Sequence, residues 1–257
     1  SAGELVTVIS APSDEVMGVN DRVDLGTAEA IARARICKAH MLAGVTLHDP
    51  ATTRIEHGVE IGRDCEIFGG VSLRGKTRIG EGCVIDQGCV LTDVIVESGA
   101  HCKPYTIAAS SHIGPRCQVG PFSHLRPDSR LLEESHVGNF VELKKTELGR
   151  KSKANHLAYL GDSIIGSEVN IGCGTITCNY DGFAKHQTII EDGVFIGSDS
   201  QLVAPVRIGK GAIVAAGTTV TRDVPAGALT VSRVPQQDKL EAADKLRARF
   251  KARKART

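Results

Sequence analysis

The sequence predicts an all-β fold, a parallel β-helix of hexapeptide repeats, with a short helix before it and an extended arm and a helix after it. Three observations predict this fold. Aliphatic or small residues recur every six positions between Ile55 and Pro225, glycine often follows them, and the 257 residues include no Trp and three Tyr. Six residues are too few for a helix pair or a propeller blade, and so few aromatic residues suit a narrow core of Ile, Val and Leu.

The repeat is defined by the residue that opens each unit. Each unit predicts one short strand and one corner, so three units make a triangular coil of about eighteen residues. At about 4.8 Å per coil, roughly nine coils form a rod of about 45 Å. The opening residues, which should point inward, are Ile55, Ile61, Ile67, Leu73, Ile79, Ile85, Leu91, Val96, Cys102, Ala108, Ile113, Val119, Leu125, Leu131, Val137, Leu143, Leu148, Ala154, Leu160, Ile165, Ile171, Thr177, Phe183, Ile190, Ile196, Leu202, Ile208, Val214 and Val220.

Departures from the six-residue step predict where corners differ. Steps of five residues follow Leu91, Ala108, Leu143 and Leu160, and these steps should shorten a corner. The step from Phe183 to Ile190 is seven residues, which lengthens one. We therefore expect the segment 179–186 to bulge outward, where it can reach a ligand or a neighbouring subunit.

Composition excludes several classes of protein. Lys and Arg number 31 and Asp and Glu 30, so no overall basic charge predicts nucleic-acid binding. A secretory signal and a membrane-spanning apolar run are both missing from the sequence, so we expect a cytoplasmic protein and no membrane partner. Five of the eight cysteines fall on inward positions of the repeat and should be buried thiols without a disulfide: Cys65, Cys83, Cys89, Cys102 and Cys117.

The two ends differ from the repeat region and predict three segments: 1–44, 45–232 and 233–257. Residues 1–26 are polar and extended in character, and Thr27–Leu42 reads as a helix with Thr27 as N-cap and Gly44 at its end. Residues 233–237 predict an extended arm, and 238–256 a basic helix that includes Arg256. That helix has two interpretations. It could bind acidic lipid or nucleic acid, or it could be a solvated helix. We favour the solvated helix because aromatic residues are sparse.

A coil brings residues about eighteen apart into contact, so two columns are predicted. Arg126 and Lys144 stack as two cations, which a phosphate would join, although both side chains can also extend into water. Ser198 and Ala216 leave room for a long thin ligand, or simply pack a corner. His156, close to the cations in sequence, is a candidate general base or a structural histidine. No histidine pair has the short spacing of a zinc site.

Several segments carry a resemblance to a known family. The segments are 120–127, 136–145, 156–161, 174–182 and 197–205, within a similarity that runs from about Gly18 to Arg233. They resemble the hexapeptide-repeat acyltransferases, and most closely the acetyltransferase domain of the bacterial bifunctional glucosamine-1-phosphate N-acetyltransferases and N-acetylglucosamine-1-phosphate uridyltransferases. We expect residues 1–44 to be a remnant of the junction with the uridyltransferase domain, with that domain missing and no uridyltransferase activity.

The resemblance implies an activity, an assembly and a handedness. The reaction would be acetyl transfer from acetyl-CoA, the co-substrate, to the amine of glucosamine-1-phosphate, on the pathway through UDP-N-acetylglucosamine to peptidoglycan and lipopolysaccharide. It would need no metal, since magnesium serves only the uridyltransferase domain. The coil would be left-handed, and a homotrimer would form each active site between subunits.

The resemblance also assigns roles to residues. His156 would be the general base, Glu142 would steady it, and Ser198 would stabilise the oxyanion; Asn179 would also act at the reacting centre. The residues that would bind the sugar phosphate are Arg126, Lys144, Tyr159, Asn170 and Lys185. The residues that would line the acetyl-CoA site are Cys173, Asn179, Tyr180, Ser198, Ala216 and Arg233. Cys173 departs from the family, which often has Ala there.

Two alternatives stay open on the residues alone. One is acyl transfer to another sugar or to an amino acid. The cations Arg126, Lys144 and Lys185 argue against this alternative, because they favour an acceptor that carries a phosphate. The other is a structural rod that keeps the prism without chemistry. A structural rod would not require His156 together with the other polar residues of the predicted site.

Overall fold

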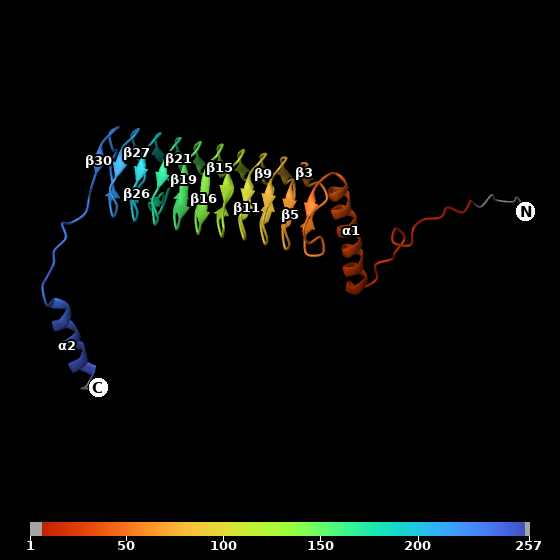
Figure 1. Cartoon of the computed structure of the whole chain (residues 1–257), viewed down its shortest axis with the longest axis horizontal. Helices are drawn as coiled ribbons and strands as arrows, with labels where there is room; N and C mark the ends of the chain where they lie inside the picture. The colour runs from red at the N-terminus through yellow and green to blue at the C-terminus, as the bar shows by residue number, and fades with distance from the viewer. Residues whose placement is uncertain (1–6, 255–257) are drawn as a thin grey trace, which may run out of the picture.

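The computed structural model describes residues 7–254 and contains the predicted left-handed parallel β-helix (Figure 1). The coil is a long prism, with helix α1 (Arg22–Leu42) at its N-terminal end and helix α2 (Ala242–Lys254) beyond its C-terminal end. Residues 1–6 of the predicted first segment, and Arg256 of the predicted basic helix, lie outside the described residues.

Three parallel sheets form the faces of the prism, because each strand pairs with the strand one coil before it and one coil after it. Sheet A contains β1 (Thr46–Leu47), β4 (Glu66–Ile67), β7 (Val84–Ile85), β10 (His101–Cys102), β13 (Gln118–Val119), β16 (His136–Asn139), β19 (Lys153–His156), β22 (Asn170–Ile171), β25 (Phe195–Ile196), β28 (Ile213–Val214) and β30 (Leu229–Thr230). Sheet B contains β2 (Arg54–Ile55), β5 (Ser72–Arg74), β8 (Val90–Thr92), β11 (Ile107–Ala109), β14 (His124–Leu125), β17 (Glu142–Lys144), β20 (Tyr159–Gly161), β23 (Ile176–Cys178), β26 (Gln201–Val203) and β29 (Thr219–Val220). Sheet C contains β3 (Glu60–Ile61), β6 (Arg78–Ile79), β9 (Ile95–Val96), β12 (His112–Ile113), β15 (Arg130–Leu131), β18 (Glu147–Leu148), β21 (Ser163–Ile165), β24 (Thr188–Ile190) and β27 (Val206–Ile208).

The opening residue of each repeat fills the prism, as predicted, with two exceptions. Ile61 is half-buried and packs against the core, and Phe183 is 97% exposed. The other predicted inward residues are buried. The five predicted interior cysteines are also buried and free, and burial raises the pKa of the Cys89 thiol to about 12. These thiols are therefore core side chains.

Glycine follows many inward residues because successive coils approach closely at the corner. A Cβ added to Gly138 would lie 2.0 Å from the carbonyl oxygen of Asn155, and one added to Gly149 would lie 2.1 Å from that of Gly166. No side chain fits in such a gap. The glycines of the repeat thus permit backbone hydrogen bonds between coils, such as Gly149 N to Ile165 O at 2.8 Å.

Helix α1 begins earlier than predicted. Asp21, not Thr27, is the N-cap, because its carboxylate accepts hydrogen bonds from Val23 N at 2.8 Å and Asp24 N at 2.9 Å. Thr27 lies inside the helix, where its hydroxyl donates to Val23 O. The predicted end is confirmed, since Gly44 follows the helix with a φ of 98°.

The prediction for Phe183 was wrong. The coil spacing rises to 25 residues between Thr177 and its partner Leu202, and the extra residues form a loop between β23 and β24. The Asp181 carboxylate accepts the N–H groups of Phe183 and Ala184, both at 2.8 Å, which turns the chain outward. The expected outward bulge is confirmed for residues 180–185, whereas Asn179, its predicted first residue, is buried.

The C-terminal segment leaves the coil after β30. Residues 231–239 have no helix or strand, and α2 lies apart from the coil (Figure 1). Helix α2 begins at Ala242, four residues later than predicted. None of its side chains is buried.

Candidate active site

One corner of the prism, between sheets A and B, gathers several predicted site residues into a column. The backbone hydrogen bonds Asp199 N to Cys173 O (2.7 Å) and Gly217 N to Ser198 O (2.8 Å) link successive coils there. We call this set the corner column: Asn139, His156, Cys173, Ser198 and Ala216. Sequence spacing predicted only the Ser198 and Ala216 part of it. The 25-residue coil hid the step from Cys173 to Ser198, because it interrupts the regular period there.

His156 lies on the outside of the prism at the end of β19, and its side chain is exposed. Its Nδ1 lies 2.9 Å from Oδ1 of Asn139, and β16 and β19 pair these two residues directly. An amide oxygen only accepts hydrogen bonds, so Nδ1 must carry the proton in this contact. In the neutral ring Nε2 is then the unprotonated nitrogen, with a lone pair available to accept a proton.

Glu142 contacts a different residue from the one expected. Its Oε1 lies 2.9 Å from Nη1 of Arg126, and the structure describes no hydrogen bond between Glu142 and His156 within this chain. The carboxylate raises the pKa of Arg126, chiefly through that hydrogen bond, so Arg126 is held as a cation. A role for Glu142 toward His156 stays a prediction.

Arg126 and Lys144 do lie on neighbouring coils of sheet B, as their spacing predicts, because Leu125 pairs with Leu143. Tyr159 follows on the next coil, where it pairs with Glu142. The outer face of sheet B therefore carries two cations and a phenol in adjacent rows. This face begins at Tyr159, three residues after His156 and across the corner formed by Leu157 and Ala158.

Gly161 leaves room for two polar side chains, those of Tyr159 and Asn179, to approach one another. A Cβ added to Gly161 would lie 2.6 Å from both the hydroxyl of Tyr159 and Nδ2 of Asn179. Asn179 is buried, and Nδ2 donates to Oδ2 of Asp162 at 2.5 Å. Tyr159 and Asn179 thus meet at the edge of sheet B, just before the corner with sheet C.

The loop after β23 carries Tyr180 and Lys185. Lys185 Nζ lies 4.3 Å above the ring of Tyr180, and the two residues form an isolated antiparallel bridge. His186 Nε2 lies 2.6 Å from Oδ2 of Asp181. Backbone hydrogen bonds from Ala184, the contact with His186 and a backbone hydrogen bond from Phe183 hold the pKa of the Asp181 carboxyl well below its usual range. The loop is therefore closed on itself by hydrogen bonds.

The remaining predicted residues lie around the corner column. Asn170 is on the outer face of sheet A, paired with Lys153 and Phe195. Arg233 comes from the C-terminal arm, and its Nη1 donates to the carbonyl oxygen of Ala216. Arg233 thus places a cation at the far end of the column.

Further cations lie near His156 on sheet A. His136 pairs with Lys153 in the sheet and is half-buried. Burial lowers the pKa of His136, and the charges of Lys103, Lys153 and His156 lower it further. The surface beside His156 is therefore one where an added positive charge is unfavourable and an anion is favoured.

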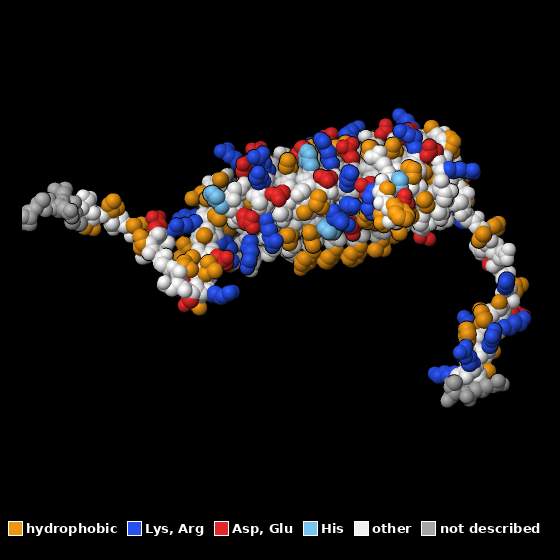
Figure 2. Space-filling model, turned by 180° about the vertical axis from the view of Figure 1, so that it is seen from behind, with side chains coloured by type: hydrophobic (Ala, Val, Ile, Leu, Met, Phe, Trp, Pro, Cys, Tyr) orange, Lys and Arg blue, Asp and Glu red, His pale blue; other side chains and the backbone are white. Residues whose placement is uncertain are grey.

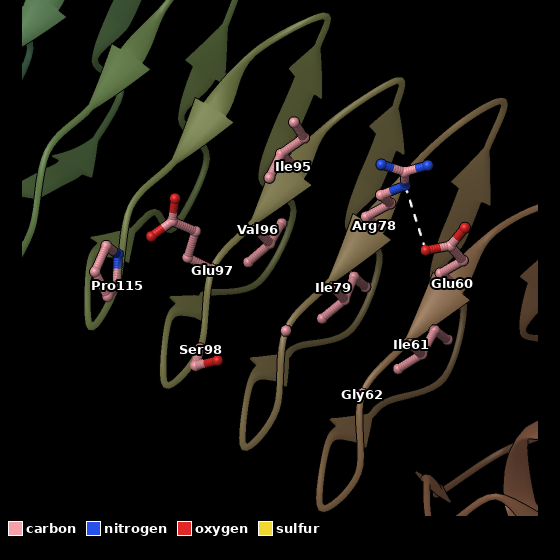
Figure 3. Close-up of a pocket in the computed structure, with 11 residues that line it drawn as sticks. Glu60, Ile61, Gly62, Arg78, Ile79, Ile95, Val96, Glu97, Ser98 and Pro115 are labelled. Atoms are coloured by element: carbon pink, nitrogen blue, oxygen red, sulfur yellow. Dashed lines mark ion pairs between the residues drawn. The ribbon is translucent and has the colours of Figure 1, made fainter.

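Two hollows lie on the coil away from His156. One follows the corner between sheets B and C and is lined by Asp128, Arg130, Lys145, Thr146, Glu147, Asp162, Ser163, Ile164, Lys185, His186 and Gln187. The other lies on sheet C near the N-terminal end, where Glu60 and Arg78 form an ion pair of 3.3 Å (Figure 3). None of the predicted site residues lines the second hollow. The first contains Lys185 and also Asp162, the carboxylate that contacts Asn179.

Three residues important to this geometry were missed by sequence reasoning: Asn139, Gly161 and Asp162. Asn139 precedes His156 by seventeen residues, which is the spacing of one shortened coil, so the register could have identified it. Asp162 precedes Asn179 by the same seventeen residues, so the register could have identified it as well. Gly161 gave no such signal.

The structure offers no metal centre or membrane span among residues 7–254. No group of three or more His, Cys, Asp or Glu side chains is placed to hold a metal ion in this part of the chain. Neither described helix has the length and apolar character that crossing a bilayer requires.

The arrangement has two chemical parts. The corner column offers a neutral imidazole nitrogen beside small residues and backbone N–H groups, which suits proton removal next to a thin ligand. The outer face of sheet B offers Arg126 and Lys144, which suit an anionic group. Both parts lie on convex surfaces of one chain, so a closed site needs a second surface against them.

Comparison with known proteins identifies relatives. Residues 187–222 match the family of bacterial transferase hexapeptide repeats (six repeats). The chain is 54% identical over 250 residues to the bifunctional protein GlmU of Sorangium cellulosum (strain So ce56), covering 97% of this chain and 52% of that protein. It is 49% identical over 247 residues to the bifunctional protein GlmU of Geobacillus sp. (strain WCH70), covering 96% of this chain and 54% of that protein. The chain therefore spans about half the length of these curated relatives.

A solved structure shares the fold. The crystal structure of the Francisella novicida UDP-N-acetylglucosamine acyltransferase superposes with a TM-score of 0.52, at 17% sequence identity, over 79% of this chain and 73% of that one. At this identity the likeness concerns the β-helix alone.

Proposed function

Because the chain is a homologue of the bacterial GlmU proteins over about half of their length, we propose that it transfers an acetyl group from acetyl-CoA to the amine of glucosamine-1-phosphate. The products are N-acetylglucosamine-1-phosphate and CoA, on the route to UDP-N-acetylglucosamine. One observation carries the proposal. The contact between His156 Nδ1 and Asn139 Oδ1 leaves Nε2 as an exposed base, next to a column of small residues.

The reaction follows from these groups. Nε2 of His156 accepts a proton from the sugar amine, and the nitrogen lone pair forms a bond to the acetyl carbonyl carbon. A donor at Ser198 stabilises the resulting oxyanion. The intermediate then collapses, the carbon–sulfur bond breaks, and the CoA thiolate takes up a proton from the His156 imidazolium. Atoms and charge balance without any further reactant.

The sugar phosphate is placed by the cations of sheet B. Arg126 and Lys144 lie in adjacent rows, and the contact with Glu142 raises the pKa of Arg126, which stays a cation. Tyr159, Asn170, Asn179 and Lys185 would complete the sugar site. The acetyl-CoA would extend along the corner column past Cys173, Ser198 and Ala216, with Tyr180 and Arg233 at its sides. A phosphate and a thioester are then held on opposite sides of His156.

A homotrimer would close the site, and an exposed ridge supports this part of the proposal. Tyr105, Phe122, Phe140 and Leu157 occupy the same corner position on four successive coils, with φ values from 46° to 59°. Their exposure is between 49% and 58%, and hydrophobic side chains gather along the lower edge of the coil (Figure 2). The rings stack, with centroids 5.1 Å apart for Tyr105 and Phe122 and 5.6 Å for Phe122 and Phe140.

The ridge is energetically unfavourable in a monomer. A bulky residue in the left-handed region costs about 1–2 kcal/mol, and other coils place glycine at this corner, such as Gly88 and Gly174. Exposed apolar rings add a further cost that contact with another copy would remove. Phe140 and Leu157 directly follow Asn139 and His156, so that contact would set the neighbouring copy beside the base.

A thiol-release assay tests the proposed function. Acetyl-CoA with glucosamine-1-phosphate should release CoA, and glucosamine without the phosphate should react at least about tenfold more slowly, because the contacts with Arg126 and Lys144 are lost. Equal rates for the two acceptors would favour acyl transfer to another sugar or amino acid. The absence of turnover together with the absence of acetyl-CoA binding would favour a structural rod.

A further inference from the structure

Asp162 is a buried carboxylate to which the proposed function assigns no role. Its side chain is 10% exposed, and it occupies the corner between sheets B and C with a φ of 48°. The loop of residues 179–187 returns to the coil beside it, where Thr188 N donates to Asp162 O at 3.2 Å. Asp162 thus lies beneath the corner at which the inserted loop leaves the coil.

Both carboxylate oxygens of Asp162 face named partners. Oδ2 accepts a hydrogen bond of 2.5 Å from Asn179 Nδ2, and Oδ1 lies 3.9 Å from Nζ of Lys145. A buried carboxylate without such partners would be strongly destabilising. These two contacts therefore hold the Asp162 carboxylate in place, and the carboxylate in turn orients the side-chain amide of Asn179.

The contact decides which atom Asn179 presents to a ligand. A carboxylate accepts and cannot donate, so the amide nitrogen must face Asp162 and the amide oxygen must face away. No described residue donates a hydrogen bond to Oδ1 of Asn179. The atom of this side chain without a partner is therefore an acceptor, and it suits an N–H donor.

We infer that Asp162 is a positioning residue for acetyl transfer, which holds Asn179 with its carbonyl oxygen toward an N–H group of a substrate. The inference rests on the proposed function. Two substrate groups have this chemistry, the amine of the sugar and the amides of the pantetheine arm. Gly161 supports the arrangement, since any side chain there would collide with the amide of Asn179 and the hydroxyl of Tyr159.

The test is a double-mutant cycle with steady-state kinetics. Asp162→Ala should lower kcat by about 10- to 100-fold, because a misplaced contact group costs that much. Asn179→Ala should cause a similar loss, and the double variant should lose no more than Asn179→Ala alone. Asp162→Asn keeps an acceptor oxygen and should retain more activity than Asp162→Ala. A rise in KM for glucosamine-1-phosphate or for acetyl-CoA identifies which N–H group is bound.

The matched control is Asp128→Ala. Asp128 is the left-handed residue of the same corner two coils earlier, with a φ of 63° and an exposed side chain, so its variant should stay within about twofold of the parent. Additive losses in the cycle, or near-normal kcat in a folded Asp162→Ala variant, would overturn the inference.

A second measurement separates this inference from the proposed function. If the parent protein shows no acetyl transfer, the proposed function fails, and the crystal structure of Asp162→Ala decides the positioning role. We expect the Asn179 side chain to rotate or become disordered in that structure. An unchanged Asn179 amide would contradict the role of Asp162, whether or not the enzyme is active.

Discussion

At the residue scale, the chemistry depends on a single amide. The side-chain oxygen of Asn139 accepts a hydrogen bond of 2.9 Å from Nδ1 of His156. This contact alone selects Nε2 as the ring nitrogen without a proton. Neither residue is buried, so the contact has to be maintained by the strand pairing of β16 and β19. The base is thus prepared by backbone register as well as by side-chain chemistry.

Replacing Asn139 should disturb the base without removing it. In Asn139→Leu the acceptor is lost, both tautomers of His156 become available, and kcat should fall by about 10- to 100-fold. Asn139→Asp keeps an acceptor oxygen and should retain more activity. Steady-state rates for the two variants check this, and equal activity of Asn139→Leu and the parent would contradict the tautomer argument.

His136 gives a pH prediction. Its pKa is lowered in the folded state by burial and then by Lys103, Lys153 and His156, so the unfolded chain binds a proton more readily. Its contribution to stability is fully present above the ordinary histidine pKa of about 6.5 and is lost as the pH falls from there through the lower pKa of the folded state. In His136→Gln, urea unfolding between pH 8 and pH 5 should show a smaller fall in the free energy of unfolding. The same slope in variant and parent would exclude His136 as the cause.

At the scale of the element, the coil depends on corners where no side chain fits. Gly149 lies between sheets C and A, far from the corner column, and its missing Cβ leaves room for the carbonyl of Gly166. This close approach allows neighbouring strands to pair along the whole rod. Stability should therefore be sensitive to any single methyl group at these positions.

Gly149→Ala should destabilise the coil by about 1–3 kcal/mol, because the added methyl group forces two coils apart. The control is Gly26→Ala in helix α1, where a Cβ meets nothing within 4 Å. That variant should gain about 0.5–1 kcal/mol from the higher helix propensity of Ala. Chemical denaturation measures both, and a neutral Gly149→Ala would contradict the close-packing explanation.

The elements also show why sequence reasoning succeeded in the coil and failed at its margins. The inward residues were predicted because a hydrophobic period is set by the backbone geometry itself. Phe183 fitted that period by chance, whereas the hydrogen bonds of Asp181 turn the chain outward there. The cap was misplaced because Asp21 and Thr27 are both good capping residues, and only the structure shows which one meets free N–H groups.

The candidate site was partly predictable for the same reason. Arg126 and Lys144 lie one regular coil apart, so their proximity follows from counting. Asp162 and Asn179 also lie one shortened coil apart, seventeen residues in sequence, because β20 and β23 pair Tyr159 with Ile176. Their proximity could be counted as well, whereas the hydrogen bond itself depends on side-chain orientation, which leaves no periodic trace in the sequence.

At the scale of the whole molecule, the proposed homotrimer makes the ridge a test of assembly. Phe140→Asp should disrupt the contact between copies and lower turnover, because a charge would be buried against an apolar surface. Ile95→Asp is the control, a similarly exposed apolar residue on sheet C. Analytical ultracentrifugation should show dissociation of the first variant only. A trimeric and active Phe140→Asp protein would remove the ridge from the interface.

In the proposed function, the prism as a whole holds the neutral imidazole of His156 between a bound aminosugar phosphate and a thioester. The most direct measurement is the rate of CoA release by His156→Ala with saturating glucosamine-1-phosphate and acetyl-CoA, together with acetyl-CoA binding by calorimetry. We predict that turnover falls by about two to four orders of magnitude while acetyl-CoA affinity stays within about twofold. Turnover close to that of the parent protein would contradict the account.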